Sequence, residues 1–467
     1  MPEPDPEWTA GTAPGTCPSV THAVALFRRP LDFLTSLPAH GDLVEIRLGP
    51  VRAWVACEPR LVHHVLMDPR TFDKGGPLYD RLRTLMGDGL VTCRQEAHRR
   101  QRRLLQPAFG PPRVAGHLAL IGEEADAVCR AWRAGHTVDL TAALTALTTG
   151  VTSRVLFSDS LGAAQAAAVR DSLAVIVRGL FVRTVVPVDA LFRVPTPGNR
   201  RYLRAVARLH AVVDSLVAER RRDAGCDERD DLLGTLLRCA HGDGAGALTE
   251  RGLRDQLVTL LLTGVESTAM CLASVFALLA GHPDAERRLH EEVDEVLAGR
   301  SVPGPGELAR LRYTRCVVTE TLRVAPPGWL FTRVTTREVR LAGRRLPRGT
   351  TVLYSPYLLH HDPASFPEPG RFRPERWLPE RAAAVPGGAL LPFAAGNRKC
   401  IGDTLAMTEA TAAVAVVAAR WRLRPVSGHE GPPRPAATLG PRSLVMRCEP
   451  RRRTPAGGPP GARPPAP

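Results

Sequence analysis

Lysine is almost missing from this chain of 467 residues, in which Lys74 and Lys399 are the only two lysines. The net charge of +15 therefore comes almost entirely from arginine, and a charge of this size would suit a nucleic-acid-binding protein. However, the heavy use of Ala, Pro, Gly and Arg is typical of GC-rich coding sequences, which accounts for part of that charge. Aromatic residues are only 5% of the chain and do not alternate with the arginine clusters, so platforms for stacking bases are missing. We expect no nucleic-acid partner, although a basic face suits the docking of an acidic redox protein.

Paired cysteines and targeting segments are missing as well. The ten cysteines include no C-x-x-C pair, which excludes the usual spacings of zinc and iron–sulfur sites. They therefore fit isolated residues in a reducing compartment. Residues 1–21 contain acids and prolines but no apolar core segment, so neither a signal peptide nor an N-terminal membrane anchor is expected. These absences predict a cytoplasmic protein.

One apolar stretch, residues 257–279, is long enough to be considered as a membrane span. Glu266 falls in its middle, together with Ser267 and Thr268, and a charged side chain at that depth in lipid would be costly. A long buried helix that crosses a globular core explains the stretch better. Such a helix would end before Pro283.

Proline and glycine are spread along the chain and mark no linker between domains. We therefore expect a single domain over residues 19–449, with a loose segment at 1–18 and a disordered Pro/Arg/Gly-rich tail at 450–467. Helical patterns dominate residues 95–280, and a final helix is expected from about Ile401 to Trp421. Together with a few short strands, this pattern predicts a mainly α fold with a small β region. The expected strands cover residues 43–48, 51–56, 339–341 and 351–355.

The most informative motif is F-x-x-G-x-R-x-C-x-G at residues 393–402. A cysteine thiolate that ligates haem iron needs a tight loop that shields the sulfur and keeps it ionised. Gly396 allows the loop to turn, and Phe393 can cover the sulfur of Cys400. Arg398 can donate two hydrogen bonds to a haem propionate, while Gly402 removes a side chain where the macrocycle must lie flat. A helix that begins after Cys400 would favour the thiolate through its N-terminal N–H groups.

This motif resembles the haem-binding loop of the cytochrome P-450 superfamily. The resemblance implies the cytochrome P-450 fold, haem b as cofactor and Cys400 as the axial ligand of its iron. The other interpretation is a buried free cysteine in a glycine-containing loop, which is a common feature of proteins. The further motifs of the chain favour the haem loop.

The long apolar helix carries the residues Thr263, Gly264, Glu266, Ser267 and Thr268, in an order that resembles the helix over the distal face of the haem in this family. A small residue lets substrate or dioxygen approach, the acid can relay protons, and a hydroxyl can bond a helix carbonyl or the bound oxygen. By register Ser267 takes the role of the alcohol, and Thr268 can share it. Hydroxyls in mid-helix can also simply bond to their own carbonyls, but Gly264 and Glu266 favour the catalytic interpretation.

Three basic residues are candidates for binding the haem propionates. His98 and Arg102 lie at i and i+4 of a predicted helix and can both point at one propionate, which is the purpose that the resemblance assigns to this helix. Arg333 is a further candidate. The same arginine-rich run also fits a solvated face, so we expect its remaining arginines to point outward and to contact a ferredoxin. These are Arg99, Arg100 and Arg103.

Glu320 and Arg323 form an E-x-x-R pair, whose spacing places both side chains on one face of a helix. The pair lies upstream of Cys400, and residues 374–377 between them resemble the P-E-R-F element of the family, with Trp377 in the last place. We expect Glu320, Arg323 and Arg376 to form a buried network that supports the haem loop without a catalytic role.

The substrate is predicted to be small and apolar. The motif order and the segments 72–76, 195–202 and 399–403 resemble actinobacterial P-450 enzymes that hydroxylate cyclic terpenes. This resemblance implies a monomeric monooxygenase of secondary metabolism, including antibiotic biosynthesis, that hydroxylates an unactivated C–H bond. Electrons would come from NAD(P)H through a ferredoxin reductase and a ferredoxin, because the chain has no dinucleotide-binding fingerprint or flavin domain. The residues predicted to line the pocket are Leu78, Leu82, Leu85, Met86, Leu180, Phe181, Leu260, Trp329, Leu330 and Phe331.

Three alternatives remain open at this point. The substrate could be a polyketide or another secondary metabolite. The enzyme could use peroxide or rearrange its substrate without dioxygen chemistry, against which the acid and alcohols at 266–268 speak. Finally, the chain could be a haem-binding sensor without catalytic activity, although no signalling module is evident in the sequence.

Overall fold

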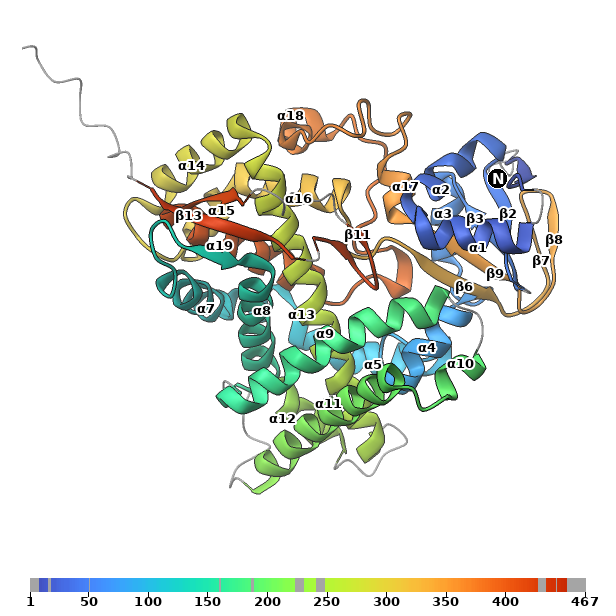
Figure 1. The fold of residues 1–467 in the computed structure, drawn as a ribbon, viewed down its shortest axis with the longest axis horizontal. Helices are drawn as coiled ribbons and strands as arrows, with labels where there is room; N and C mark the ends of the chain where they lie inside the picture. The colour runs from blue at the N-terminus through green and yellow to red at the C-terminus, as the bar shows by residue number, and fades with distance from the viewer. Residues whose placement is uncertain are drawn as a thin grey trace, which may run out of the picture.

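A β-rich part, which contains the first strands of the chain, lies beside a larger helical part in Figure 1. The structure is a computed structural model. Its description covers residues 8–15, 18–49, 51–158, 161–185, 189–222, 231–240, 248–426, 434–441 and 443–451. This arrangement confirms the predicted fold class, a mainly α protein with a small β region.

The main sheet has six strands in the order β1-β2-β3-β9-β6-β4. β2 and β3 are antiparallel, with Leu43 opposite Ala56, as predicted for a strand pair on either side of Gly49. β9 lies parallel to β3 and antiparallel to β6, so the sheet joins the first strands of the chain to segments beyond residue 330. The strands are β1 (Ala10–Thr12), β2 (Leu43–Leu48), β3 (Val51–Ala56), β4 (Phe72–Asp73), β5 (Thr137–Asp139), β6 (Phe331–Thr335), β7 (Val339–Leu341), β8 (Arg344–Leu346), β9 (Thr351–Tyr354), β10 (Trp421–Pro425), β11 (Arg434–Pro435), β12 (Leu439–Gly440) and β13 (Val445–Pro450).

The N-terminal segment differs in part from the prediction. Residues 1–18 were expected to be loose, but β1 pairs in parallel with β2 and places Ala10 opposite Leu43. The side chain of Trp8 also donates a hydrogen bond to Glu58 at 3.0 Å. A short sequence rich in proline and glycine can therefore still add an edge strand, because its backbone groups pair with a strand that is far away in sequence. The predicted disordered tail falls largely on residues 452–467, which lie outside the described residues.

The helical part is built around α13, which runs through the middle of the molecule (Figure 1). Thr249 caps its start by accepting a hydrogen bond from the N–H of Gly252 at 3.0 Å. The final helix α19 begins at Asp403, two residues later than predicted. The helices are α1 (Pro18–Arg28), α2 (Pro30–Ser36), α3 (Pro59–Met67), α4 (Pro77–Met86), α5 (Gln95–Leu105), α6 (Pro111–Gly116), α7 (Leu118–Arg130), α8 (Leu140–Phe157), α9 (Ala163–Val185), α10 (Asp189–Arg193), α11 (Pro197–Arg222), α12 (Leu232–Ala240), α13 (Glu250–Ala280), α14 (Pro283–Leu297), α15 (Pro305–Arg310), α16 (Arg312–Val324), α17 (Pro356–His360), α18 (Pro379–Ala382) and α19 (Asp403–Arg420), with short 3-10 helices η1 (Leu37–His40), η2 (Gln106–Phe109), η3 (Pro374–Trp377) and η4 (Gly396–Arg398).

Two of these helices, α8 and α13, are long and apolar enough to cross a membrane by length and composition. Most of each apolar window is buried, 61% for α8 and 72% for α13. α13 packs against α8, α16 and α19 within the largest apolar core. A helix that is apolar on all sides is expected where protein surrounds it, so the predicted buried core helix is confirmed.

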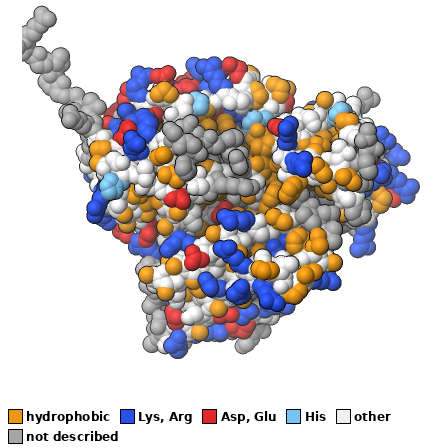
Figure 2. All heavy atoms as spheres, in the orientation of Figure 1, with side chains coloured by type: hydrophobic (Ala, Val, Ile, Leu, Met, Phe, Trp, Pro, Cys, Tyr) orange, Lys and Arg blue, Asp and Glu red, His pale blue; other side chains and the backbone are white. Residues whose placement is uncertain are grey.

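The face of the molecule in Figure 2 mixes basic and apolar side chains. Most of the large apolar side chains that are exposed lie on two helical regions, α1 and α9 to α11. On α1 they are Val20, Val24 and Phe27, which share one side of the helix because they lie four and three residues apart.

Candidate active site

The loop before α19 holds Cys400 at the end of a tight turn. Gly396 has a left-handed conformation with φ +66°, and a Cβ there would lie 2.5 Å from the carbonyl oxygen of Leu66 in α3. Glycine meets both conditions, as the spacing predicts. The N–H of Cys400 donates to the carbonyl of Phe393 at 2.9 Å and closes the loop. The residues of the motif therefore fix the position of Cys400 through the conformation and hydrogen bonding of the backbone.

The other two fixed residues of the loop have different surroundings. Phe393 is half-buried and packs against the helical core. A Cβ on Gly402 would meet only the ring of Phe109, at 3.9 Å, which is an ordinary contact. Protein packing alone does not require glycine at this position. Space for a flat macrocycle at Gly402 and cover of the sulfur by Phe393 both stay predictions.

Opposing influences act on the thiol of Cys400. Burial is the largest and raises the pKa of the thiol, and Asp403 also raises it. A backbone N–H from Gly402 and the positive charges of Lys74 and Arg102 oppose this rise and favour the thiolate. Cys400 nevertheless has exposed surface, so we infer that its surface faces an interior space. A metal cation beside the sulfur would complete the deprotonation.

Positive charges converge on His98, which is buried in α5. Its imidazole has a pKa lowered to about 3, chiefly by burial and then by the charges of Arg398, Lys74, Arg102 and Arg333. Lys74 is itself buried, and burial together with Arg333 and Arg398 holds its pKa well below the usual range. Four cations from α5, β6, the thiolate loop and the segment after β4 therefore share one small region.

Negative charge in this region is scarce. Asp73 pairs with Arg398 at 2.7 Å. Among the residues that the structure describes, it is the acid that forms an ion pair with one of these four cations. Arg398 also donates to the carbonyl of Cys93 at 3.0 Å, but its Nε is buried without a partner. Nδ1 of His98 is buried without a partner as well. Unpaired buried donors and excess positive charge are expected where anionic groups bind, so these residues fit the two propionates of a haem.

Arg102 and Arg333 each have contacts within the protein that were not predicted. Nη1 of Arg102 donates to the carbonyl oxygens of Asn397 and Lys399, so the side chain braces the thiolate loop. Arg333 is fully buried, donates to the carbonyl of Thr332 and lies over the ring of Tyr354 at 5.4 Å. A propionate contact of either residue stays a prediction. The i, i+4 spacing gave the shared face of His98 and Arg102 but could not reveal the long-range partner of Arg102.

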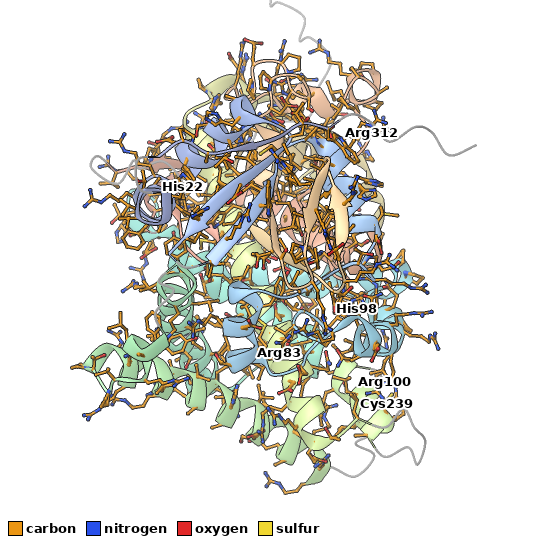
Figure 3. All side chains as sticks on the ribbon, turned by 90° about the vertical axis from the view of Figure 1, so that its right-hand side faces the viewer. His22, Arg83, His98, Arg100, Cys239 and Arg312 are labelled. Atoms are coloured by element: carbon orange, nitrogen blue, oxygen red, sulfur yellow. The ribbon has the colours of Figure 1, made fainter. Side chains whose placement is uncertain are left out.

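The predicted inward and outward faces of α5 are confirmed. His98 is buried, Arg102 is half-buried, and Arg99, Arg100 and Arg103 are exposed. Figure 3 labels His98 and Arg100, which differ in burial although they are only two residues apart. One face of α5 therefore serves the interior while the other carries positive charge to the surface.

Sequence reasoning assigned no role to two residues of this region, Asp73 and Lys74. Both are buried and both carry charge. The available signal was the rarity of lysine, because Lys74 is one of only two in the chain. A lone lysine next to a phenylalanine, an aspartate and two glycines is not the composition of an ordinary solvated surface.

The acid and alcohols of α13 lie one turn or less apart. Burial raises the pKa of Glu266, and the hydroxyl of Thr438 donates to its Oε1 at 2.9 Å. The hydroxyl of Ser267 donates to the carbonyl of Thr263 at 2.7 Å. Thr268 is buried, and its hydroxyl has no hydrogen-bond partner among the residues that the structure describes. Ser267 is thus bonded to its own helix, while Thr268 keeps a free hydroxyl.

Gly264 has a packing role in α13. A Cβ at this position would lie 3.1 Å from the methyl and hydroxyl groups of Thr152 in α8. Contacts of that length are tight, so glycine lets α8 and α13 approach each other. Glycine had been predicted here because it would open the helix groove to substrate or dioxygen. The close contact with α8 is enough to explain the glycine by packing, so its role in access stays a prediction.

The predicted buried charge network is confirmed, while its support of the haem loop stays a prediction. Arg323 and Glu320 form an ion pair at 2.8 Å with both side chains fully buried, and Arg376 approaches Glu320 to 3.4 Å. Nε1 of Trp377 donates to the same carboxylate at 2.8 Å. Arg323 also donates to the carbonyl of His360. The network therefore joins α16 and α17 to η3, in the stretch that leads to the thiolate loop.

The predicted pocket residues are all buried or half-buried, but they fall into separate apolar clusters. Leu85, Met86 and Leu260 share one cluster. Trp329 belongs to another, with the ring of Phe181 6.3 Å away. Phe331 differs, because it packs in a third cluster and stacks on Tyr354 at 5.3 Å.

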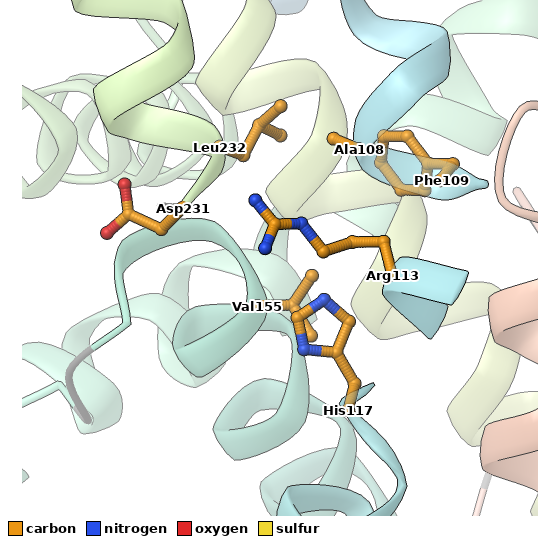
Figure 4. A pocket seen from close by; sticks show the side chains of 7 residues that line it. All are labelled: Ala108, Phe109, Arg113, His117, Val155, Asp231 and Leu232. Atoms are coloured by element: carbon orange, nitrogen blue, oxygen red, sulfur yellow. The ribbon is translucent and has the colours of Figure 1, made fainter. Parts of the chain in front are cut away.

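A small cavity of about 10 Å³ lies between η2, α6, α8 and the start of α12, and Figure 4 shows its lining. That volume is about enough for one water molecule. It does not belong to the site described above. Its lining residues are Ala108, Phe109, Arg113, His117, Val155, Asp231 and Leu232.

A mainly helical fold, a cysteine held in a tight loop and a buried group of cations beside it define a haem-thiolate protein. Comparisons with known proteins agree. The family model for cytochrome P450 matches residues 23–450, and the chain therefore belongs to the cytochrome P450 family. It is a cytochrome P450 monooxygenase with haem b as its cofactor, which confirms the resemblance seen in the haem loop.

Three relatives are similar over nearly their whole length. Cyclooctat-9-en-7-ol 5-monooxygenase of Streptomyces melanosporofaciens is 51% identical, with 96% of this chain and 97% of the relative covered. Cyclooctatin synthase of the same organism is 44% identical, with 95% and 96% covered. Pentalenene oxygenase of Streptomyces avermitilis is 42% identical, with 95% and 98% covered. These relatives are actinobacterial, as the resemblance implied.

Proposed function

We propose that this enzyme hydroxylates an unactivated C–H bond of an apolar, cyclic terpenoid in secondary metabolism. The reaction consumes substrate, dioxygen, two electrons and two protons, and it forms the alcohol and water. The names of the three relatives support a terpenoid substrate, because two of them refer to cyclooctat-9-en-7-ol and cyclooctatin and the third refers to pentalenene. The observation that carries the proposal is the position of Cys400 beside the cationic cluster, combined with the acid and alcohols of α13.

Each part of the site has a separate task in this proposal. Sγ of Cys400 would hold the haem iron, and bound haem supplies the thiolate-ligated iron that activates dioxygen. Arg398 and His98 would bind the propionates through nitrogens that are buried without a partner, and Lys74 would add its positive charge. Arg102 holds the backbone of the thiolate loop. The protein thus supplies orientation and charge, while the cofactor supplies the oxidative chemistry.

Proton delivery is assigned to Glu266, Ser267 and Thr268. Burial raises the pKa of Glu266, which brings an acid closer to the pH at which it can both accept and release a proton. A hydroxyl beside it can pass a proton onward. If register decides the operative alcohol, Ser267→Ala should raise the yield of hydrogen peroxide per dioxygen consumed more than Thr268→Ala does. The reverse order would transfer the role to Thr268, whose hydroxyl is free in the structure.

The electron donor is proposed to be a ferredoxin that is reduced by NAD(P)H through a ferredoxin reductase, acting on a monomeric enzyme in the cytoplasm. The exposed arginines of α5 lie on the helix that also reaches the haem loop through Arg102. Lys399 is half exposed beside Cys400 and pairs with Asp403 at 2.6 Å. A basic surface near the thiolate would attract the acidic surface of a ferredoxin, and the rate of electron transfer should fall as salt concentration rises.

The first experiment is the spectrum of the reduced, carbon-monoxide-bound holoprotein, followed by titration with cyclic sesquiterpenes and diterpenes. A red-shifted Soret band of the thiolate type is expected, and a low-spin to high-spin change with one terpene would identify the substrate class. A spectrum of the histidine-ligated type would refute Cys400 as the ligand. A spin change with polyketides but with none of the terpenes would refute the terpenoid substrate.

A further inference from the structure

A hairpin near the end of the chain reaches the acid of α13. The hydroxyl of Thr438 donates to Oε1 of Glu266 at 2.9 Å, across a sequence separation of 172 residues. Thr438 lies in the loop that joins β11 to β12, where Pro435 pairs with Leu439. Its carbonyl accepts a hydrogen bond from the N–H of Ala436 at 3.1 Å, which keeps the loop compact. The donor to Glu266 therefore belongs to a short element with a defined shape.

The same hairpin is fixed from two sides. Nε1 of Trp329 donates to the carbonyl of Ala436 at 3.0 Å, and the N–H of Leu439 donates to the carbonyl of Pro327 at 2.9 Å. On the other side, a Cβ on Gly440 would lie 2.9 Å from the sulfur of Met270, one turn beyond Glu266 on α13. The hairpin is thus held between α13 and the segment that carries Trp329, a residue predicted to line the substrate pocket.

No other charged group competes for this carboxyl among the residues described. Burial is the largest influence on the pKa of Glu266 and raises it, and the hydrogen bond from Thr438 lowers it. The charged groups on the neighbouring elements have other partners or positions. Arg154 of α8 pairs with Glu123 and Glu124, and within α16 Glu320 pairs with Arg323. Glu286 of α14 pairs with Arg424 of β10. The charge of Glu409 in α19 contributes to the raised pKa of Cys271.

We propose that Thr438 is a positioning residue for proton delivery, whose hydroxyl fixes the Glu266 carboxyl beside the hydroxyls of Ser267 and Thr268. This inference rests on the proposed role of Glu266. The carboxyl would take up a proton from the bulk solvent and pass it on towards the dioxygen being reduced, with two protons from the solvent and two electrons from the ferredoxin consumed for each substrate oxidised. When delivery fails, the same electrons and protons form hydrogen peroxide and leave the substrate unchanged. Because the hairpin also holds Trp329, substrate contact and proton delivery would depend on one element.

The test compares Thr438→Val, which keeps the shape but removes the donor, with Thr438→Ser, which keeps the hydroxyl. In the holoprotein, Thr438→Val should raise the ratio of peroxide to product by roughly tenfold, the size expected for a lost hydrogen bond to a charged group. It should also move the titration of the Glu266 carboxyl, followed by its infrared band against Glu266→Gln, to higher pH. Thr438→Ser should keep the wild-type values in both measurements. If Thr438→Val gives little holoprotein, Thr438→Ala replaces it.

The Glu266→Gln background separates the two proposals. Thr438→Val should have no further effect there, because the hydroxyl acts only through the carboxyl. If Glu266→Gln alone leaves the ratio of peroxide to product unchanged, the proposed role of Glu266 fails. If Glu266→Gln uncouples the enzyme while Thr438→Val keeps the wild-type titration and ratio, only the role of Thr438 is overturned. An equal effect of Thr438→Val in both backgrounds would mean that Thr438 is merely structural, which also overturns the inference.

Discussion

Replacing Glu320 with glutamine tests the buried network directly. Glutamine keeps the shape of the side chain but removes the charge, and its NH₂ group would face donors from Arg323, Trp377 and the backbone of Arg373. Glu320 and Arg323 are both fully buried, so the guanidinium would lose the one carboxylate that pairs with it among the residues that the structure describes. Breaking one side of a buried ion pair costs about 3–5 kcal/mol. That is a large part of a free energy of unfolding of about 5–15 kcal/mol.

The assay is urea unfolding of holoprotein, followed both by circular dichroism and by the Soret band. Glu368→Gln is the matched control, because Glu368 pairs with Arg371 and Arg373 nearby but is 55% exposed. Exposed pairs contribute only about 0.2–1 kcal/mol. The two variants should therefore differ by several-fold in their loss of stability. A loss below about 1 kcal/mol for Glu320→Gln, equal to that of the control, would refute the stabilising role of this buried network.

Three further predictions concern the loop, the cations and a buried histidine. Gly396→Ala forces a side chain into left-handed backbone against the carbonyl of Leu66, so the ratio of haem to protein should fall well below wild type, and equal occupancy would contradict this. Lys74→Met should release haem to apomyoglobin roughly tenfold faster because a buried cation is lost. The exposed control Lys399→Met should change the KM for ferredoxin instead. Identical rates of haem loss in the two variants would contradict the role of Lys74 in binding haem. The pKa of His360 is lowered to about 3 by burial, so the unfolded chain binds a proton that the folded chain rejects, and stability should fall as the pH drops from 6.5 towards 3, by about 2 kcal/mol at pH 5. His360→Gln, which keeps an acceptor for the N–H of Leu391, should flatten the urea-unfolding profile in this range, and an unchanged slope would contradict it.

Local spacing in the sequence predicted the parts of the site whose residues lie close together in the chain. The haem loop depends on the turn at Gly396 and on the hydrogen bond from Cys400 to Phe393, all within ten residues. The pair Glu320–Arg323 depends on one turn of α16. In such cases residue type and spacing nearly determine geometry, and the structure confirmed the turn at Gly396 and the pairing of Glu320 with Arg323.

Contacts between distant segments could not be predicted in the same way. The carbonyl partners of Arg102 lie 295 and 297 residues away, and Thr438 lies 172 residues from Glu266. Nothing in the local sequence of either segment marks these partners, because they result from how whole elements pack. β1 was missed for a related reason, since its pairing depends on β2 rather than on strand-forming residues of its own.

The group of cations around His98 has a consequence for how the protein is assembled. Arg398, Lys74, Arg102 and Arg333 repel one another, and Asp73 neutralises only part of their charge. A dianionic cofactor would act as the missing counter-ion, so binding haem would relieve repulsion that the newly made polypeptide must otherwise sustain. The segments that carry these charges, from β4 to α5, β6, and from α18 to α19, would then settle last. Haem supply during synthesis would limit how much of this chain reaches its final packing.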